Sequence, residues 1–226
     1  MAGKFEVGHP FRVTAVESQR MADYSPSRML GEDPPYRTLS YPMENVLNLN
    51  FTKLIDPSTE YLEALNRWEN DPILIPFMRV CQNEEDIRKT TTVTLEEIKQ
   101  RLKHDNTWLI HLDGQLIGEM GFQVDPKHLY KKIPGTAWLG ITIGEEIGRG
   151  KGIGYLALQY LEEQIKEQGL KRAELGVFEF NTQAIRLYQK LGYQEFARID
   201  GFTYWQGRKW QDIRMEKYIP QAGEGG

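Results

Sequence analysis

Residues 137 to 154 read Ala137-Trp-Leu-Gly-Ile-Thr-Ile-Gly-Glu-Glu-Ile-Gly-Arg-Gly-Lys-Gly-Ile-Gly154, and an amphipathic segment follows from 155 to 170. The first half is apolar and β-branched, which favours a buried strand. The glycines and cations that come next indicate a loop, and the apolar spacing after them predicts a helix. A helix N-terminus that follows such a loop gathers free backbone N–H groups and positive charge, so this stretch predicts a site for a polyanion, pyrophosphate above all.

The loop carries the residue types that bind such an anion. Glycines at alternate positions from Gly148 to Gly154 can adopt positive φ and let an anion approach the backbone closely. Arg149 and Lys151 add charge-assisted donors. The plainer interpretation is a flexible turn between a strand and a helix. A P-loop is excluded because no Gly-Lys-Ser/Thr follows at the required spacing, and the βαβ unit of a dinucleotide fingerprint is not evident.

Composition bounds the class of protein. The 226 residues are 40% hydrophobic and 27% charged with a net charge of −4, which is ordinary for a soluble globular protein and gives no reason to expect nucleic-acid or membrane binding. The single cysteine, Cys81, excludes an intrachain disulfide framework. Without a signal-peptide pattern at the start of the sequence we expect a cytoplasmic protein, monomeric or homodimeric. We expect no metal, because the histidines show no ligand spacing: His9, His104, His111 and His128.

The periodicity of the rest predicts an α/β (α+β) fold, a mixed sheet with helices on its faces. The predicted elements are a strand at 46–55, a helix from 58 to 70, a loop with a helical turn at 73–92, a helix at 94–103, hairpin strands at 108–112 and 115–122, a strand at 136–144, a helix ending at 169, a strand at 172–178, a helix at 181–191 and a final hairpin at 196–205 and 212–219.

The sequence also predicts the domain boundaries. The prolines in residues 1–42 favour an irregular N-terminal arm. We expect residues 43–220 to form one domain, without an internal repeat, and residues 221–226 to form a flexible tail.

Two motifs resemble those of the GNAT superfamily, the acyl-CoA-dependent N-acyltransferases. The run from Arg149 to Gly154 matches the signature Arg/Gln-x-x-Gly-x-Gly/Ala. The run Asn181-Thr-Gln-Ala-Ile-Arg-Leu-Tyr-Gln-Lys-Leu-Gly-Tyr193 is similar to the second cofactor motif, Asn-x-x-Ala-x-x-x-Tyr-x-x-x-Gly-Phe, with Tyr193 in place of Phe. The resemblance covers roughly residues 45–219 and implies a mostly antiparallel sheet of about seven strands with about four helices.

The resemblance also implies acetyl-CoA as the acetyl donor and assigns residues to it. Backbone N–H groups of the loop would hold the pyrophosphate, and a strand that separates from its neighbour would bind the pantetheine. Tyr188 would lie near the thioester sulfur and protonate the departing thiolate, whereas in other surroundings it would be read as a core aromatic. Asn181 would contact the pantetheine, and it is also a typical helix N-cap. The implied binding residues are Leu139, Ile141, Thr142, Ile143, Arg149, Gly150, Lys151, Gly152, Ile153, Gly154, Asn181 and Tyr188.

We expect the amine to attack the thioester directly, in a ternary complex. Only the neutral amine is a nucleophile, so a base must remove its proton. Glu119 is the favoured candidate, since it lies in the strand before the expected cofactor strand. His111, Glu145 and Glu146 remain alternatives, and each is also consistent with an ordinary solvated or paired residue.

The acceptor is less well defined. In this family the helices after the first strand and the turn at 202–210 would line the acceptor side, where Trp68, Tyr204, Trp205 and Trp210 either contact an amine or fill the core. The acidic balance favours a cationic acceptor such as a polyamine, an aminoglycoside or a protein N-terminus. The alternative is a non-catalytic acyl-CoA-binding or interaction module.

Overall fold

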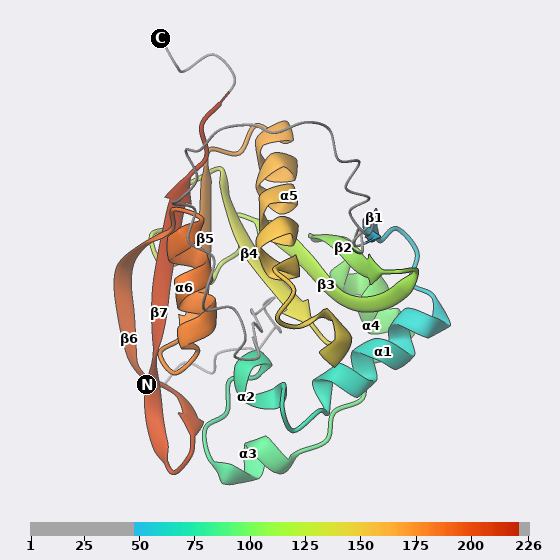
Figure 1. The fold of residues 1–226 in the computed structure, drawn as a ribbon. Helices are drawn as coiled ribbons and strands as arrows, with labels where there is room; N and C mark the ends of the chain where they lie inside the picture. Colours follow the sequence, from blue (N-terminus) through green and yellow to red (C-terminus); the bar gives the residue numbers. More distant parts are fainter. Residues whose placement is uncertain (1–47, 222–226) are drawn as a thin grey trace, which may run out of the picture.

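The computed structural model describes residues 48–221, and its centre is one seven-stranded sheet (Figure 1). The strands are β1 (Leu49–Lys53), β2 (Asp105–Leu112), β3 (Gln115–Val124), β4 (Thr136–Ile143), β5 (Arg172–Phe178), β6 (Gln194–Trp205) and β7 (Arg208–Tyr218). The helices are α1 (Thr59–Glu69), α2 (Ile75–Met78), α3 (Glu84–Arg88), α4 (Leu95–Arg101), α5 (Ile153–Glu167) and α6 (Thr182–Lys190), with a 3₁₀ turn η1 (Glu146–Gly148). The predicted arm over residues 1–42, the start of the first strand at 46–47 and all but the first residue of the tail lie outside the described residues.

The order of strands in the sheet is β1-β2-β3-β4-β5-β7-β6. Every neighbouring pair is antiparallel except β4 and β5, which run parallel. That parallel pair is joined by α5, the crossover helix that a parallel connection requires. The mixed, mostly antiparallel sheet is therefore confirmed.

The parallel pair is joined over a short length only. β4 and β5 pair at Thr136–Trp138 with Arg172–Glu174, and beyond these residues each strand keeps its outer neighbour but loses the other. Figure 1 shows the two strands diverging toward the end of the sheet at which α5 begins. The sheet is thus open on the side that the glycine loop borders.

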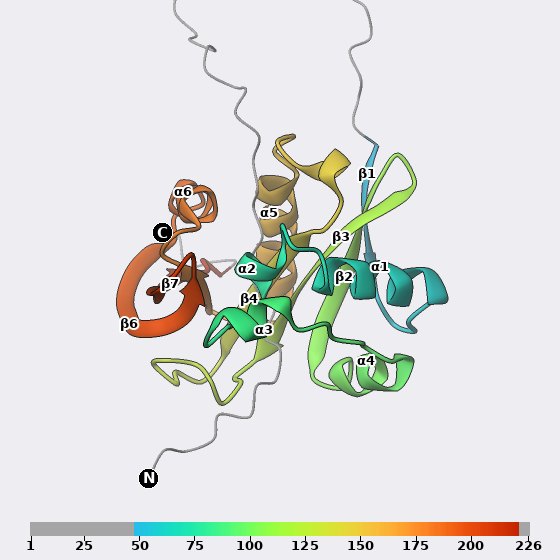
Figure 2. The same ribbon diagram turned by 90° about the horizontal axis from the view of Figure 1, so that it is seen from below.

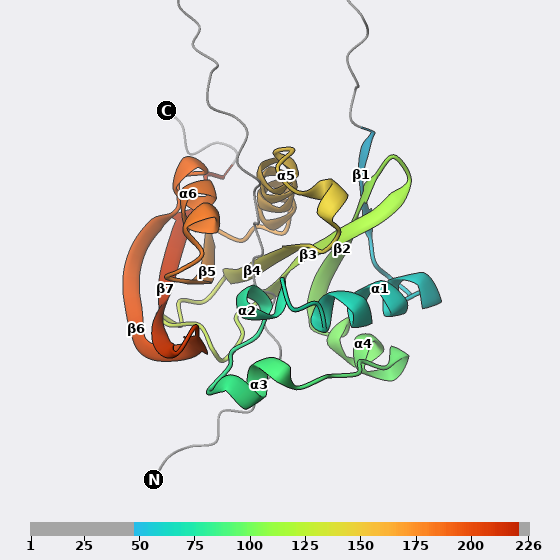
Figure 3. The same ribbon diagram turned by 60° about the horizontal axis from the view of Figure 1, so that its bottom comes forward.

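Helices cover the sheet in two layers, which the views in Figures 2 and 3 separate. On one face α5 and α6 pack on the strands, with apolar side chains such as Leu158 and Leu161 against Ile110 and Ile141. On the other face α1 and α4 close a second, smaller core, which contains Tyr61, Leu65, Trp68, Ile98 and Leu116. The site described below lies between these layers, where the sheet opens.

Most element boundaries agree with the periodicity. Asp-Gly between two apolar strands predicts a type I′ turn, and both Asp113 and Gly114 have positive φ (52° and 81°), which confirms it. The pattern Thr-x-x-Glu predicts a capping box, and Thr94 and Glu97 form it at the start of α4. Gly169, at φ 72°, follows the last turn of α5 as expected.

Residues 73–92 differ from the prediction, because they form two short helices instead of a loop with one turn. Pro76 lies in the first turn of α2, where its missing N–H costs nothing. Asn83 caps α3 by accepting from the Asp86 N–H (3.0 Å). Both helices are too short for apolar periodicity to reveal them, and only Pro76 in α2 and the N-cap Asn83 of α3 mark them in the sequence.

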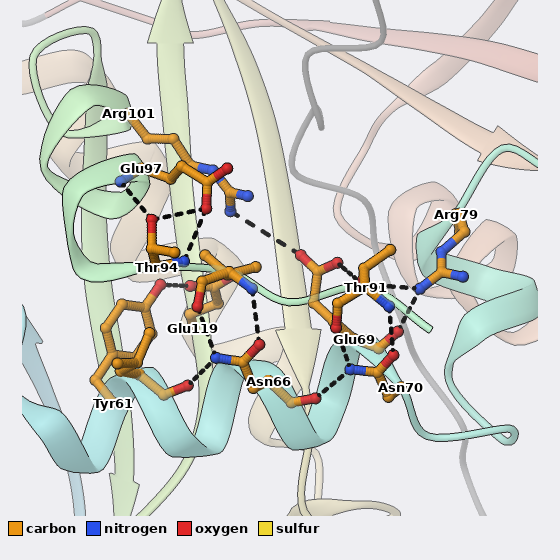
Figure 4. Close-up of polar contacts among 12 residues, drawn as sticks. Tyr61, Asn66, Glu69, Asn70, Arg79, Thr91, Thr94, Glu97, Arg101 and Glu119 are labelled. Carbon is orange, nitrogen blue, oxygen red and sulfur yellow. Dashed lines mark hydrogen bonds and ion pairs between the residues drawn. The ribbon is translucent and has the colours of Figure 1, made fainter. Parts of the chain in front are cut away.

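Two asparagines on α1 fix the chain that follows these short helices (Figure 4). The Asn66 amide donates to the Val93 carbonyl (2.9 Å) and accepts from the Val93 N–H (2.8 Å). Asn70, one turn later, makes the same pair of bonds with Thr91 (2.8 and 2.9 Å). The two amide side chains thus bond to backbone groups that a neighbouring strand would otherwise satisfy, and they hold residues 91–93 along α1.

Candidate functional site

The glycine loop ends at a helix N-terminus that has unused donors. Gly150 and Gly152 take positive φ (71° and 73°), and Gly152 is the N-cap of α5 without a side-chain cap. In the described chain, the backbone N–H groups from Gly150 to Gly154 find no backbone acceptor, whereas those of Tyr155 and Leu156 bond to the Gly152 carbonyl (3.1 and 3.3 Å). Free N–H groups at the start of a long helix are the ready-made site for a phosphate-type anion.

The two cations of the loop differ in their surroundings. Lys151 is exposed beside the free N–H groups. Arg149 is mostly buried and bonds back to the end of β4: its Nη2 donates to the Gly144 carbonyl (2.6 Å) and its Nε to that of Ile143 (3.4 Å). Its Nη2 also lies 4.0 Å from a carboxylate oxygen of Asp71. Arg149 thus stabilises the strand end and links it to the region after α1, and Lys151 is the cation available at the loop surface.

We expect Gly152→Ala to weaken binding of acetyl-CoA about tenfold, because a residue with a Cβ loses about 1–2 kcal/mol in the left-handed conformation and the loop must change shape to relieve it. A Cβ at Gly152 meets no atom within 4 Å, so the effect is conformational. Calorimetric titration with acetyl-CoA measures it.

Gly169→Ala is the matched control for this experiment. It lies at the other end of α5 with nearly the same φ (72°) and equally open surroundings. It should destabilise the fold to a similar extent and leave the affinity for acetyl-CoA unchanged. Equal loss of affinity in both variants would contradict the assignment of the loop.

Past the short ladder, β5 does not pair with the backbone edge of the diverging strand β4. Its residues Leu139, Ile141 and Ile143 pack into the core under α5, whereas Thr142 is on the opposite face, opposite Glu119 of β3. Among the described residues, the ladder between β4 and β5 ends at Trp138. A pantetheine chain, which contains amide groups, has the chemistry to pair with such an edge.

The second motif forms α6, on the far side of the opening. Asn181 is buried and caps α6 by accepting from the Ala184 N–H (3.3 Å), as its sequence pattern predicts. Tyr188 is completely buried, 5.7 Å between ring centroids from Tyr193. Within the described chain its hydroxyl has no hydrogen-bond partner, and burial raises its pKa well above the usual value. A buried, unpartnered hydroxyl is costly unless it serves a ligand.

Glu119 lies on the other side of β4, facing α1. It is opposite Leu109 of β2 and Thr142 of β4, and its side chain is buried. One carboxylate oxygen accepts a hydrogen bond from the hydroxyl of Tyr61, at the start of α1 (Figure 4). The carboxylate therefore stands one strand away from the open edge, beneath the helix layer predicted to line the acceptor side.

The surroundings of Glu119 make it a group that titrates near neutrality. Burial raises its pKa to about 7, and the hydrogen bond from Tyr61 and the charge of Arg101 oppose that rise. The nearby carboxylates of Glu69 and Asp105 raise it further. A base with a pKa close to the working pH is suited to general base catalysis.

The other candidate bases have different environments. Glu145 accepts hydrogen bonds from Trp68 Nε1 and Arg67 Nη2 (both 2.9 Å). Burial opposes its ionisation, but these bonds and the Arg67 charge outweigh it and lower its pKa. Glu146 is exposed at the start of η1. His111 is half-buried in β2, next to the hairpin turn, with a buried Nδ1 that has no partner among the described residues.

Of the aromatic residues predicted for the acceptor side, Trp68 belongs to the core. It covers Gly144 so closely that a Cβ there would lie 2.2 Å from the indole. Tyr204, Trp205 and Trp210 are partly exposed in the β6–β7 hairpin. Trp210 donates its indole N–H to the Trp205 carbonyl (2.9 Å).

The segment between α2 and α3 connects the two halves of the sheet across the open end, where α2 and α3 lie in Figures 2 and 3. The Tyr204 N–H donates to the Cys81 carbonyl (2.7 Å), and the Cys81 N–H donates to the hydroxyl of Thr203 (3.1 Å). Phe77 and Phe180 contact each other at 5.6 Å between ring centroids. This segment therefore joins α2 to the β6–β7 hairpin, the turn predicted to line the acceptor side.

Sequence reasoning did not find Tyr61 or Asp71. Tyr61 appears in the sequence only as an apolar position of α1, and its contact with Glu119 joins residues 58 positions apart. Asp71 reads as a helix terminator. Within residues 48–221, no cluster of His, Cys, Asp or Glu is arranged to hold a metal ion, and no helix is long and apolar enough to cross a bilayer.

The opening between β4 and β5 is bordered by a loop whose N–H groups suit a phosphate-type anion and by a carboxylate with a raised pKa. This combination is what a protein needs if it binds a long acyl carrier and transfers the acyl group. Residues 62–193 match the model of the acetyltransferase (GNAT) family. The chain belongs to this family, as the two motifs predicted, and is an acetyltransferase.

Relatives agree with this assignment. The spermine/spermidine N(1)-acetyltransferase of Bacillus subtilis (strain 168) is 32% identical over 124 residues, which cover 54% of this chain and 81% of the relative. Among solved structures, an N-acetyltransferase from Staphylococcus aureus Mu50 superposes with a TM-score of 0.59 at 19% identity, over 76% of this chain and 99% of that one. Spermidine N-acetyltransferase from Vibrio cholerae, in complex with CoA and spermine, gives 0.57 at 16% identity, over 76% and 95%. These two structures support the fold.

Proposed function

We propose that this chain transfers the acetyl group of acetyl-CoA to a primary amine of a polyamine, by direct attack in a ternary complex. The observation that carries the proposal is the buried, titratable Glu119 one strand from the open edge of β4. The Bacillus relative with spermine and spermidine as its named substrates supports the choice of acceptor.

The donor would be held by the elements that border the opening. Among the described residues, the N–H groups from Gly150 to Gly154 have no backbone acceptor, and with the exposed Lys151 they suit the pyrophosphate; the edge of β4 that β5 leaves past Trp138 suits the pantetheine. Bound in this way, acetyl-CoA supplies the thioester. The buried hydroxyl of Tyr188 fits a donor group that lacks a partner until the carrier sulfur is present.

The chemistry then divides between two sides of β4. The carboxylate of Glu119, directly or through a water, takes the proton from the amine as the N–C bond forms. Backbone N–H groups of β4 stabilise the oxyanion. As the C–S bond breaks, the hydroxyl of Tyr188 gives its proton to the sulfur, and solvent exchange returns both residues to their starting states.

The carboxylates near Glu119 are compatible with a cationic acceptor. Glu69 and Asp105 are close enough to Glu119 to raise its pKa, and Arg101, which is paired with Glu69, opposes them. A second ammonium group of a polyamine could interact favourably with these carboxylates.

The test is release of CoA thiol from acetyl-CoA with spermidine, spermine, an aminoglycoside and an alanine-terminated peptide as acceptors. We expect turnover with the polyamines to exceed that with the other two. Preference for the peptide or the aminoglycoside would contradict the polyamine proposal but leave acetyl transfer intact. Tight acetyl-CoA binding without thiol release on any acceptor would favour the non-catalytic alternative.

A further inference from the structure

Tyr61 has a contact that its helix position does not require. The residue is in the first turn of α1, and its N–H is already capped by the side chain of Ser58 (3.1 Å). Its ring packs in the smaller core, 3% exposed. A phenylalanine would fill this position equally well, yet the side chain carries a hydroxyl, which donates to Glu119 Oε2.

Among the described residues, Tyr61 donates the one hydrogen bond that the carboxylate of Glu119 accepts. Arg101 of α4 is near, but its ion pair is with Glu69, at 4.0 Å. The position of the Glu119 carboxylate relative to β4 therefore depends on one hydrogen bond from α1.

We propose that Tyr61 is a positioning residue for acetyl transfer: its hydroxyl holds the Glu119 carboxylate toward the open edge of β4 and stabilises it in the ionised form that accepts the amine proton. The inference rests on the proposed role of Glu119 as the base. If it is correct, a residue of α1, the helix predicted to line the acceptor side, helps to determine the pH range in which the base is ionised.

The charged groups facing Glu119 fix the sign of the effect. Tyr61 of α1 and Arg101 of α4 favour the ionised carboxylate, whereas Glu69 of α1 and Asp105 of β2 oppose it. Tyr61→Phe removes one of the two favourable contributions and leaves the packing. The pKa of Glu119 should then rise from about 7 by about one pH unit, the size expected for a lost hydrogen bond to a charged group.

The experiment has two arms. The first titrates the Glu119 carboxyl by infrared difference spectroscopy, in the full chain and in Tyr61→Phe, with Glu119→Gln to assign the band. The second measures kcat/KM for the amine from pH 5 to 9. We expect the carboxyl titration and the acid limb of kcat/KM to move upward together, with about tenfold lower kcat/KM at pH 6 and little change at pH 9.

Tyr160→Phe is the matched control, because Tyr160 packs against Phe51 and Trp108 on the other face of the sheet and should change neither titration. Combining Tyr61→Phe with Glu119→Gln should cost no more activity than Glu119→Gln alone. An unchanged carboxyl titration in Tyr61→Phe, or full additivity, would overturn the inference. If instead the carboxyl titration shifts while Glu119→Gln keeps full activity, the base assignment itself is wrong.

Discussion

Glu119→Gln should lower kcat/KM for the amine acceptor by about 10²- to 10⁴-fold near pH 8, the usual contribution of a general base. Gln has nearly the same shape and still accepts a hydrogen bond from Tyr61, so the contact with α1 is kept. The affinity for acetyl-CoA should be unchanged, because we propose that the loop at 150–154 and the edge of β4, and not Glu119, bind the carrier. Steady-state rates and a calorimetric titration measure the two quantities.

The pH profile tests the same assignment. A base acts only when ionised, so kcat/KM of the unmodified chain should rise with pH through the pKa of Glu119, about 7. In Glu119→Gln this acid limb should disappear. A variant that keeps both the rate and the limb would direct attention to His111, Glu145 or Glu146.

The raised pKa of Glu119 also predicts how the free energy of unfolding depends on pH, which can be measured independently of activity. The folded-state pKa of Glu119 is raised from 4.5 to about 7, so between these values the folded chain binds more protons than the unfolded chain. The free energy of unfolding therefore falls as pH rises through this window. Glu119→Gln has no group that titrates here, so its free energy of unfolding should not show this fall. The difference in free energy of unfolding, variant minus unmodified chain, should therefore be larger at pH 8 than at pH 5. Thermal unfolding at the two pH values checks the sign.

Local signals in the sequence predicted most of the fold. Alternation and turn chemistry are properties of short windows, so the hairpin at Asp113-Gly114 and the capping box at Thr94 were read correctly. The order of strand, glycine loop and helix around Gly152 likewise placed the predicted anion site at the start of α5. The parallel pairing of β4 and β5 was not predicted, since periodicity does not specify strand partners.

The predictions missed features that depend on distant contacts. Arg149 reads as an anion ligand because it is a cation in a glycine loop, but its guanidinium bonds to the carbonyls of Ile143 and Gly144. Tyr61 reads as a core residue, and its ring is one, but its hydroxyl reaches a strand 58 residues away. A side chain with an apolar body and a polar end group can pack in the core and also form a hydrogen bond. Sequence alone does not show which polar partner, if any, the end group reaches in the fold.

Tyr188→Phe separates a catalytic hydroxyl from a structural ring. If Tyr188 protonates the departing thiolate, the variant should lose about 10²-fold in kcat, the lower end for a general acid, because a thiolate leaves without much assistance. Tyr188 and Glu119, the proposed acid and base, lie on opposite sides of β4, so the acid limb that we assign to Glu119 should be unchanged. Rapid-quench or steady-state measurement of acetyl transfer gives kcat.

Stability makes this prediction sharper, because the two interpretations predict different combinations. The hydroxyl of Tyr188 is buried and has no partner in the described chain, so its removal should leave the free energy of unfolding unchanged or increase it by about 1 kcal/mol. A purely structural Tyr188 would give a Phe variant at least as stable and fully active. If Tyr188 is catalytic, the Phe variant should be at least as stable as the unmodified chain but should have a lower kcat. A hydroxyl without a hydrogen-bond partner in the fold is then retained because it interacts with the bound ligand. Loss of both stability and rate would show instead that the hydroxyl has a partner within the protein, and would contradict its assignment to the thioester sulfur.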